Sequence, residues 1–332
     1  MKESLLVEDL EPVRPIELAE VQAARERIAG VVLRTPLVPL DLGPGFPDVR
    51  LKLETLQPTN AYKIRGAVNA VSQLTGEERR EGVWTVSAGN AGQAVAYAAR
   101  AGGLPCTVVA IETAPRAKIA RMQALGARLI LVSYDEAWRT LERRRHPDVT
   151  GRFIHPFDDH DFIVGHATLG LEILEDAPDA AAVLTAIGGG GLITAVGSAV
   201  KALAPQVQVF GVEPETAAPA HLSFRMGSPQ VFAGWRASLV DGAGGKSLFP
   251  RMWERIRPVV DDTLLVTLEE VRAAIRTLAE RARVVAEGAG AMPLAAVMAG
   301  RVAEGPVVCV VSGGNIDLST LVACLGAETA PG

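Results

Sequence analysis

The chain has 332 residues, 48% of them hydrophobic and 21% charged, which is the composition of a globular protein large enough for two lobes of ordinary domain size. Its formal net charge of −5 argues against nucleic acid or an anionic membrane surface as a partner. No apolar run reaches the roughly 18 residues that a membrane-spanning helix needs, and the acidic N-terminal segment lacks the features of a signal peptide. The three cysteines are far apart and indicate free thiols, so we expect a soluble cytoplasmic protein.

Strands and helices alternate through the first half of the chain. Apolar residues at helical spacing predict an amphipathic helix over 17–30, and alternating residues predict a strand over 49–54. A helix follows from residue 62 or 63 to about 74. Further strands are expected at 83–87, 106–111 and 128–132, and further helices at 90–101, 115–125 and 134–145. This βαβαβα order predicts a small parallel sheet.

The second half resumes the alternation after a polar connection over 146–160. The uninterrupted apolar run 182–187 is typical of a strand that is buried on both faces. Residues 214–262 show no clear pattern. The other expected elements are helices at 162–176, 192–204, 268–283 and 289–299, strands at 207–213 and 307–311, and a final helix. The fold class is therefore α/β, with open parallel sheets flanked by helices in two lobes.

Lys63 stands at the beginning of a predicted helix, where the helix dipole disfavours a cation. A solvated surface lysine would explain this position by itself. The surrounding stretch, from Leu53 to Ala67, is more specific because it reads as a strand end, a turn through Pro58 and Asn60, and then the helix.

Four consecutive glycines, Gly188 to Gly191, lie between a buried strand and a helix. A simple turn needs only one or two glycines, and each costs backbone entropy. Free N–H groups at a helix N-terminus form a phosphate-binding cradle, so anion binding is the better interpretation. The dinucleotide fingerprint fails at Ile193 or Thr194 in either register, although Glu213 at the end of the next strand keeps a dinucleotide site as a weak alternative.

Two more strand-to-helix turns carry glycine beside polar residues, at 87–93 and at 312–315. A helix cap explains either turn alone. Open N–H groups at a helix start also suit a carboxylate. Three glycine-rich turns at the carboxyl ends of parallel strands mark the place where open α/β sheets bind ligands.

Taken together and in this order, the Lys63 stretch and the three turns closely resemble the fold type II pyridoxal-phosphate (PLP) enzymes, in the branch of threonine/serine dehydratases and serine racemases. The resemblance covers nearly the whole chain, from Val21 to Asp317. It implies that Lys63 forms a Schiff base with PLP and removes the Cα proton of the substrate. The implied cofactor-binding residues are Lys63, Asn90, Gly188, Gly189, Gly190, Gly191, Leu192 and Ser312. The implied substrate-binding residues are Ser87, Ala88, Gly89, Asn90 and Gln93.

The reaction follows from the same resemblance. In the family, the serine corresponding to Ser312 donates a hydrogen bond to the pyridine nitrogen without holding it protonated, which favours fast β-elimination. We therefore expect dehydration and deamination of a β-hydroxy amino acid, L-threonine or L-serine or both, to a 2-oxo acid and ammonia. The resemblance also implies a homodimer, a large PLP-binding domain over 1–78 and 158–332, and a small domain over 79–157.

Several residues depart from the family pattern. Ala88 stands where serine racemases carry a second acid/base group, which favours a dehydratase. Racemisation, other PLP eliminations or β-replacements, and a non-catalytic nucleotide-binding protein remain alternatives. His166 and Tyr62 replace the usual residues and predict a reshaped substrate pocket, so a β-hydroxy amino acid related to threonine is a further possibility.

Metal binding has two weak candidates. Glu213 and the carbonyl of Ala217 match family ligands for a divalent cation, but Pro219 stands where an acidic ligand is expected. One carboxylate is a poor site for a hard cation, which prefers six or more oxygens, so we expect no tightly bound metal. The histidines and aspartates of 155–166 fit no regular ligand spacing and are better explained as a polar connection between the lobes.

Overall fold

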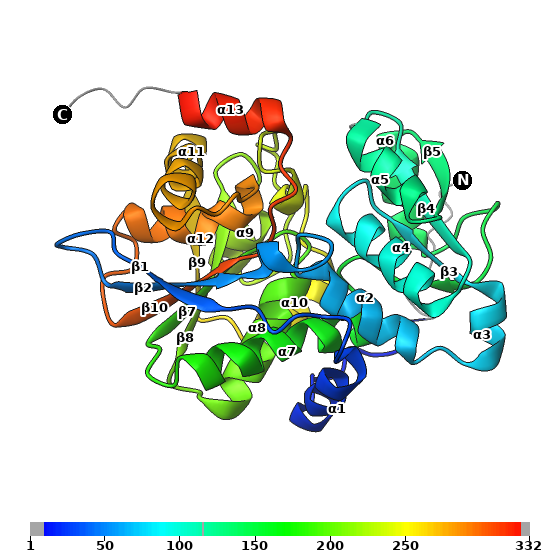
Figure 1. The fold of residues 1–332 in the computed structure, drawn as a ribbon, viewed down its shortest axis with the longest axis horizontal. Helices are drawn as coiled ribbons and strands as arrows, with labels where there is room; N and C mark the ends of the chain where they lie inside the picture. Colours follow the sequence, from blue (N-terminus) through cyan, green and yellow to red (C-terminus); the bar gives the residue numbers. More distant parts are fainter. Residues whose placement is uncertain (1–9, 115, 327–332) are drawn as a thin grey trace.

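The computed structural model describes residues 10–114 and 116–326, which form two lobes built on separate sheets (Figure 1). The larger sheet has six strands, and only the pairing of its edge strand β1 with β2 is antiparallel. In spatial order these are β1 (Leu37–Leu40), β2 (Asp48–Leu53), β10 (Pro306–Val311), β7 (Ala182–Ala186), β8 (Gln208–Pro214) and β9 (Asp262–Val266). The smaller sheet is parallel, in the order β5 (Arg128–Val132), β4 (Cys106–Ile111), β3 (Val83–Val86) and β6 (Arg152–Phe153). The α/β prediction is confirmed.

Helices flank the sheets. In chain order they are α1 (Leu18–Ile28), α2 (Lys63–Ser72), α3 (Gly76–Glu81), α4 (Asn90–Gly102), α5 (Arg116–Ala124), α6 (Tyr134–Arg143), α7 (His160–Asp176), α8 (Gly191–Leu203), α9 (Pro219–Met226), α10 (Pro250–Ile256), α11 (Leu268–Thr277), α12 (Gly288–Met298) and α13 (Leu318–Gly326). Within the part of the chain that the structure describes, no helix combines the length and hydrophobicity needed to cross a membrane.

The residues of β10 alternate between two cores. Val307, Cys309 and Val311 pack in the core that includes α11 and α12, whereas Val308 and Val310 pack in the core that includes α7 and α8. Successive side chains of a strand point to opposite faces, so a run that is apolar at every position can be buried on both. Because β10 also pairs in parallel with β7, the carboxyl ends of these two strands lie at the same edge of the sheet.

Helix α2 lies between the two lobes (Figure 1). Its residues Ile64, Ala67 and Val71 pack in one apolar cluster with residues of α4 from the smaller lobe. On another side α2 packs against α7, where Gly66 permits a close approach because a Cβ there would lie 2.3 Å from the carbonyl oxygen of Phe162. The first residue of this helix is Lys63, which therefore sits where the lobes meet.

Several short helices and strands were not predicted from the sequence. Helices α9 and α10, with eight and seven residues, and strand β9 occupy the region around 214–262 where no pattern was visible. They are too short for periodicity to identify, and tertiary packing determines them. Strand β1 and helix α3 were missed for the same reason. The helix expected over 268–283 is also divided, because α11 passes into a π-helical turn over Leu278–Ala282.

Candidate active site

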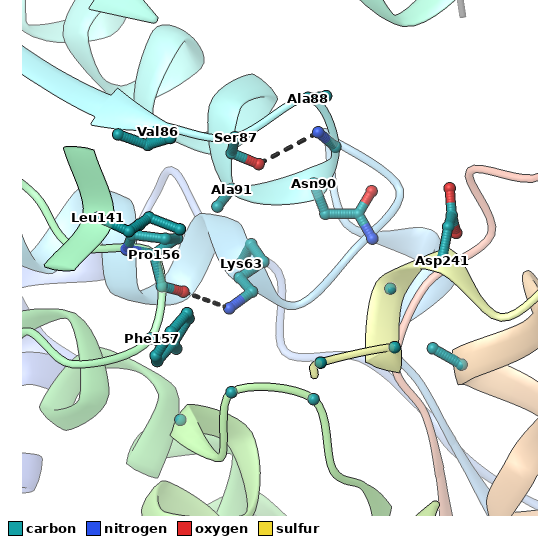
Figure 2. A pocket seen from close by; sticks show the side chains of 18 of the residues that line it. Lys63, Val86, Ser87, Ala88, Asn90, Ala91, Leu141, Pro156, Phe157 and Asp241 are labelled. Carbon is teal, nitrogen blue, oxygen red and sulfur yellow. Dashed lines mark hydrogen bonds between the residues drawn. The ribbon is translucent and has the colours of Figure 1, made fainter. Parts of the chain in front are cut away.

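A cavity of about 560 Å³ lies between the lobes, at the carboxyl ends of the central strands. Figure 2 shows Lys63 near its centre, with Asn90 to one side and Pro156 and Phe157 to the other. Nearly all residues predicted to bind cofactor or substrate line this cavity. They are Lys63, Ser87, Ala88, Gly89, Asn90, Gly188, Gly189, Gly190, Gly191, Leu192 and Ser312.

The turn before Lys63 is fixed by the segment that follows β10. Asn60 has a positive φ of 56°, which asparagine tolerates better than most residues. The N–H of Tyr62 donates to the carbonyl of Ser312 (3.0 Å), and the N–H of Gly314 donates to the carbonyl of Asn60 (2.9 Å). These backbone hydrogen bonds bring Ser312, which follows β10, next to the start of α2.

Two residues after Lys63, Arg65 anchors the first turn of α2 by buried ion pairs. Its guanidinium contacts Glu54 (2.7 Å) and Glu172 (2.7 Å), and Glu172 also pairs with Lys52 (2.9 Å). Burial alone would raise the pKa of Glu54, but Arg65 holds that pKa below its usual value. Because both acids and both bases are compensated within the network, α2 is held rigidly at its N-terminal end.

Lys63 has no such compensation. Its Nζ donates a hydrogen bond to the carbonyl of Pro156 (2.6 Å) and lies 5.0 Å and 5.3 Å from the ring centroids of Tyr62 and Phe162. No described carboxylate forms a salt bridge with it, and burial lowers the pKa of this amine to about 7. A substantial fraction of Lys63 is therefore neutral near pH 7 and available as a nucleophile or a base.

The four glycines lead from β7 into α8. A Cβ on Gly189 would lie 2.2 Å from the ring of Phe157, and Gly190 has a φ of +94° with Ile256 only 2.4 Å from an added Cβ. Packing therefore requires glycine at both positions. The same absence of side chains leaves the N-terminus of α8 open to the cavity, where its free N–H groups can bind a phosphate.

The turn over Ser87–Asn90 forms another wall of the cavity. The N–H of Gly89 donates to Ser87 Oγ (3.1 Å), and Asn90 begins α4 (Figure 2). Gln93 differs from the other predicted substrate-binding residues, because it is 2% exposed within α4 and does not line the cavity.

Comparison with known proteins identifies the family. The sequence profile of the family described as "Pyridoxal-phosphate dependent enzyme" matches residues 28–313. The chain belongs to this family. The match confirms both the predicted resemblance and PLP as the cofactor.

Individual relatives agree with that assignment. The chain is 40% identical to the L-threonine ammonia-lyase of Thermotoga maritima over 92% of this chain and 77% of the relative. It is 34% identical to a catabolic L-threonine dehydratase of Staphylococcus aureus over 93% and 92% of the two chains. Among solved structures, maize serine racemase superposes with a TM-score of 0.86 at 30% identity, covering 93% of this chain and 97% of the racemase.

The residues that the structure brings together fit PLP. The cofactor offers an aldehyde for an amine and a phosphate for an anion site, and the cavity presents the uncompensated amine of Lys63 and the open N-terminus of α8. Lys63 and Gly188 to Gly191 would hold these two groups.

The sequence analysis missed Glu287, which begins α12 and lines the cavity. Its Oε1 accepts a hydrogen bond from Asn90 Nδ2 (2.7 Å). Burial raises the pKa of Glu287 to about 7, the charge of Asp241 adds to this shift, and the Asn90 hydrogen bond opposes it. The available signal was the glycine-rich start of α12 directly after Glu287, similar to the three turns. Lys118 and Asp241, which form an ion pair (2.5 Å) at the cavity, were also missed.

The weak metal candidates serve other contacts. Glu213 is buried and accepts the backbone N–H groups of Ala220 (3.1 Å) and His221 (2.6 Å) at the start of α9. Burial raises the pKa of Glu213 to about 8, although these hydrogen bonds oppose the shift. Over residues 10–114 and 116–326, no group of three or more histidine, cysteine, aspartate or glutamate side chains is arranged to hold a metal ion.

The polar residues of 155–166 make structural contacts as well. Asp158 is buried between three arginines, Arg144, Arg251 and Arg255. His166 Nδ1 accepts a hydrogen bond from the N–H of Gly66 (3.1 Å). The histidine therefore joins α7 to the first turn of α2, which begins at Lys63.

Proposed function

We propose that the protein is a PLP-dependent ammonia-lyase that dehydrates and deaminates a β-hydroxy amino acid, with L-threonine and L-serine as the first candidates. The observation that carries the proposal is the half-buried, uncompensated amine of Lys63 in a cavity that also contains the open N-terminus of α8. The relatives named L-threonine ammonia-lyase and L-threonine dehydratase support the same reaction class.

PLP, when bound, supplies the electron withdrawal that weakens the Cα–H bond of the substrate amino acid. Lys63, neutral near pH 7, accepts that proton at Nζ. The N–H groups of the Ser87–Asn90 turn hold the substrate carboxylate, and Ser312 lines the same cavity. The rings of Tyr62 and Phe162 lie 5.0 Å and 5.3 Å from the amine and form an apolar surface beside it. Loss of the β-hydroxyl as water and later addition of water give a 2-oxo acid and ammonia, so threonine would yield 2-oxobutanoate.

Racemisation is the second candidate, because maize serine racemase has a closely similar fold. It requires a proton donor on each face of Cα. Ala88, at the turn facing Lys63, has no titratable group. This favours elimination over racemisation.

The protein is also proposed to be a cytoplasmic homodimer with two domains. Free, buried thiols at Cys106, Cys309 and Cys324 suit a reducing compartment.

One face of α13 exposes Leu318 (78%) and Val322 (66%), a surface that a second copy would cover. The domains are assigned as before, 79–157 around the smaller sheet and 1–78 with 158–332 around the larger one. Sedimentation of a Leu318→Glu, Val322→Glu variant as a monomer would support this interface, and an unchanged mass would contradict it.

The main experiment is an absorption spectrum of the purified protein with PLP, before and after L-threonine or L-serine is added. We expect a cofactor band that changes with substrate, together with a 2-oxo acid and ammonia in equal amounts. A D-amino acid as the main product would instead establish racemisation. A protein that cannot bind PLP would contradict the proposal.

A further inference from the structure

Polar side chains from separate segments form a continuous series of hydrogen bonds that ends at the cavity. Arg121 on α5 donates to Asn315 Oδ1 (2.6 Å), just beyond the end of β10. Asn315 Nδ2 then donates to Asn90 Oδ1 (2.8 Å). Asn90 Nδ2 donates to Glu287 Oε1 (2.7 Å) at the start of α12. Asn315 and Glu287 are buried, with 8% and 4% of their surfaces exposed.

The Arg121 end of this series determines its direction. A guanidinium can only donate hydrogen bonds, whereas a carboxyl oxygen such as Glu287 Oε1 can accept one in either protonation state. The amides of Asn315 and Asn90 must therefore both turn their oxygen toward the Arg121 end and their NH₂ group toward Glu287. Since an NH₂ group carries two hydrogens, one N–H of Asn90 remains for an acceptor in the cavity that Asn90 lines.

We propose that Arg121 is a positioning residue for the reaction, because through Asn315 it fixes the orientation of the Asn90 amide. An N–H of Asn90, and not its carbonyl oxygen, is then presented to the cofactor. This inference rests on the proposed function and on the cofactor-binding role predicted for Asn90, which the family resemblance places against the phenolic oxygen of PLP. An amide oxygen turned toward that oxygen would repel it.

The effect of Arg121 is partial, because Asn315 has a second anchor. Asn315 Nδ2 also donates to the carbonyl of Thr59 (2.9 Å) in the turn before Lys63, which favours the same amide orientation. Arg121 belongs to the smaller lobe, whereas Asn315 follows the central strand of the larger sheet. The orientation of Asn90 therefore depends on contact between the two lobes.

The test replaces Arg121 with Met, which keeps the aliphatic stem and removes the donor. We expect kcat/KM to fall about 3- to 10-fold, the size of one lost hydrogen bond. The pH midpoint of the bound cofactor's absorption should also shift by about half a unit to one unit, because the donor to its phenolic oxygen is weakened. Arg121→Lys, which retains a donor, should restore most of both values. Arg116→Met, at an exposed arginine of the same helix, should change neither.

Asn315→Asp provides a second variant if Arg121→Met does not fold. It places an acceptor against Asn90 Oδ1, so kcat/KM should fall roughly 10- to 100-fold, and the absorption midpoint should shift further. An absorption midpoint that stays at the wild-type value in Arg121→Met and Asn315→Asp would overturn the inference and leave the proposed function intact. A wild-type protein without a cofactor band would overturn the proposed function, and this inference with it.

Discussion

Lys63 and Arg65 lie two residues apart on α2, and the protein treats their charges in opposite ways. Arg65 is fully buried with Glu54 and Glu172 as ion-pair partners, and their charges hold its pKa above the usual value despite burial. The Lys63 amine has only two aromatic rings and the carbonyl of Pro156 as neighbouring groups among these contacts, and burial lowers its pKa to about 7.

The presence or absence of ion-pair partners distinguishes a cation with a structural role, Arg65, from an amine with a role in the reaction, Lys63. A compensated buried charge contributes a fixed geometry, and removing one partner is strongly destabilising. An amine that is buried without a partner charge lowers the stability of the folded protein. The same burial keeps a fraction of the amine neutral and therefore reactive as a nucleophile, which is the function of such a residue. The Arg65 network holds the helix in place, and Lys63 at its first turn is thereby positioned in the cavity.

Removing the Lys63 amine should have the largest effect. We expect Lys63→Ala to lower turnover of the preferred substrate by about 10³-fold or more, since the base and the site of cofactor attachment are lost together. Steady-state 2-oxo acid formation measures this. Lys201→Ala, at the far end of α8, is the control and should retain wild-type turnover. Turnover within tenfold of wild type in Lys63→Ala would refute the assigned role.

Breaking the compensated pair should mainly reduce stability. Arg65→Met leaves Glu54 and Glu172 buried without this partner and should lower the free energy of unfolding by about 3–5 kcal/mol. Urea denaturation of the cofactor-free protein measures the change. Arg50→Met is the matched control, because Arg50 pairs with Asp48 and Asp179 at the surface and should cost about 1 kcal/mol or less. Equal losses in the two variants would contradict the comparison.

Removing the uncompensated charge of Lys63 should instead increase the stability of the protein. The pKa of Lys63 is about 7 in the folded protein and near 10.5 when unfolded, so the unfolded state binds more protons between these values. The stability of the wild type therefore rises with pH through this window. Lys63→Met removes the cost and should stabilise the protein by about 1–3 kcal/mol at about pH 6, with a gain that shrinks toward about pH 10. A gain that does not vary with pH would show that ionisation is not its cause.

Glu287→Gln should give the smallest effect. The pKa of Glu287 is about 7 in the folded protein and 4.5 when unfolded, so the folded state binds more protons between these values and stability falls as pH rises. Glutamine still accepts the Asn90 hydrogen bond. We expect a stabilisation of about 1 kcal/mol at about pH 8 and no change at about pH 4. Unfolding curves at the two pH values measure the difference, and equal effects at both would contradict the assignment.

The sequence allowed much of this site to be predicted, because Lys63 and the glycine turns are local patterns. Each turn follows an apolar strand and precedes a helix, so the parallel topology brings their ends together without further information. The elements over 83–132 were expected within a residue or two of their observed bounds for the same reason.

Other parts of the site depend on tertiary structure and could not be predicted from local patterns. Asp241 lies in the region where no element was expected, and its partner Lys118 is in sequence an ordinary lysine of a predicted helix. Glu287 acquires its raised pKa only because folding buries it and brings the charge of Asp241 near it. Similarly, the partners of Arg65 come from the short turn that follows β2 and from α7, more than 100 residues apart.

The proposed reaction requires that the uncompensated amine of Lys63 is the one that binds the cofactor. Borohydride reduction of the PLP-loaded protein, followed by mass spectrometry of its peptides, tests this claim directly. We predict one cofactor per chain, attached to the peptide that contains Lys63, and none on Lys52 or Lys118. Attachment at another lysine, or no attachment while the protein retains turnover, would contradict the account.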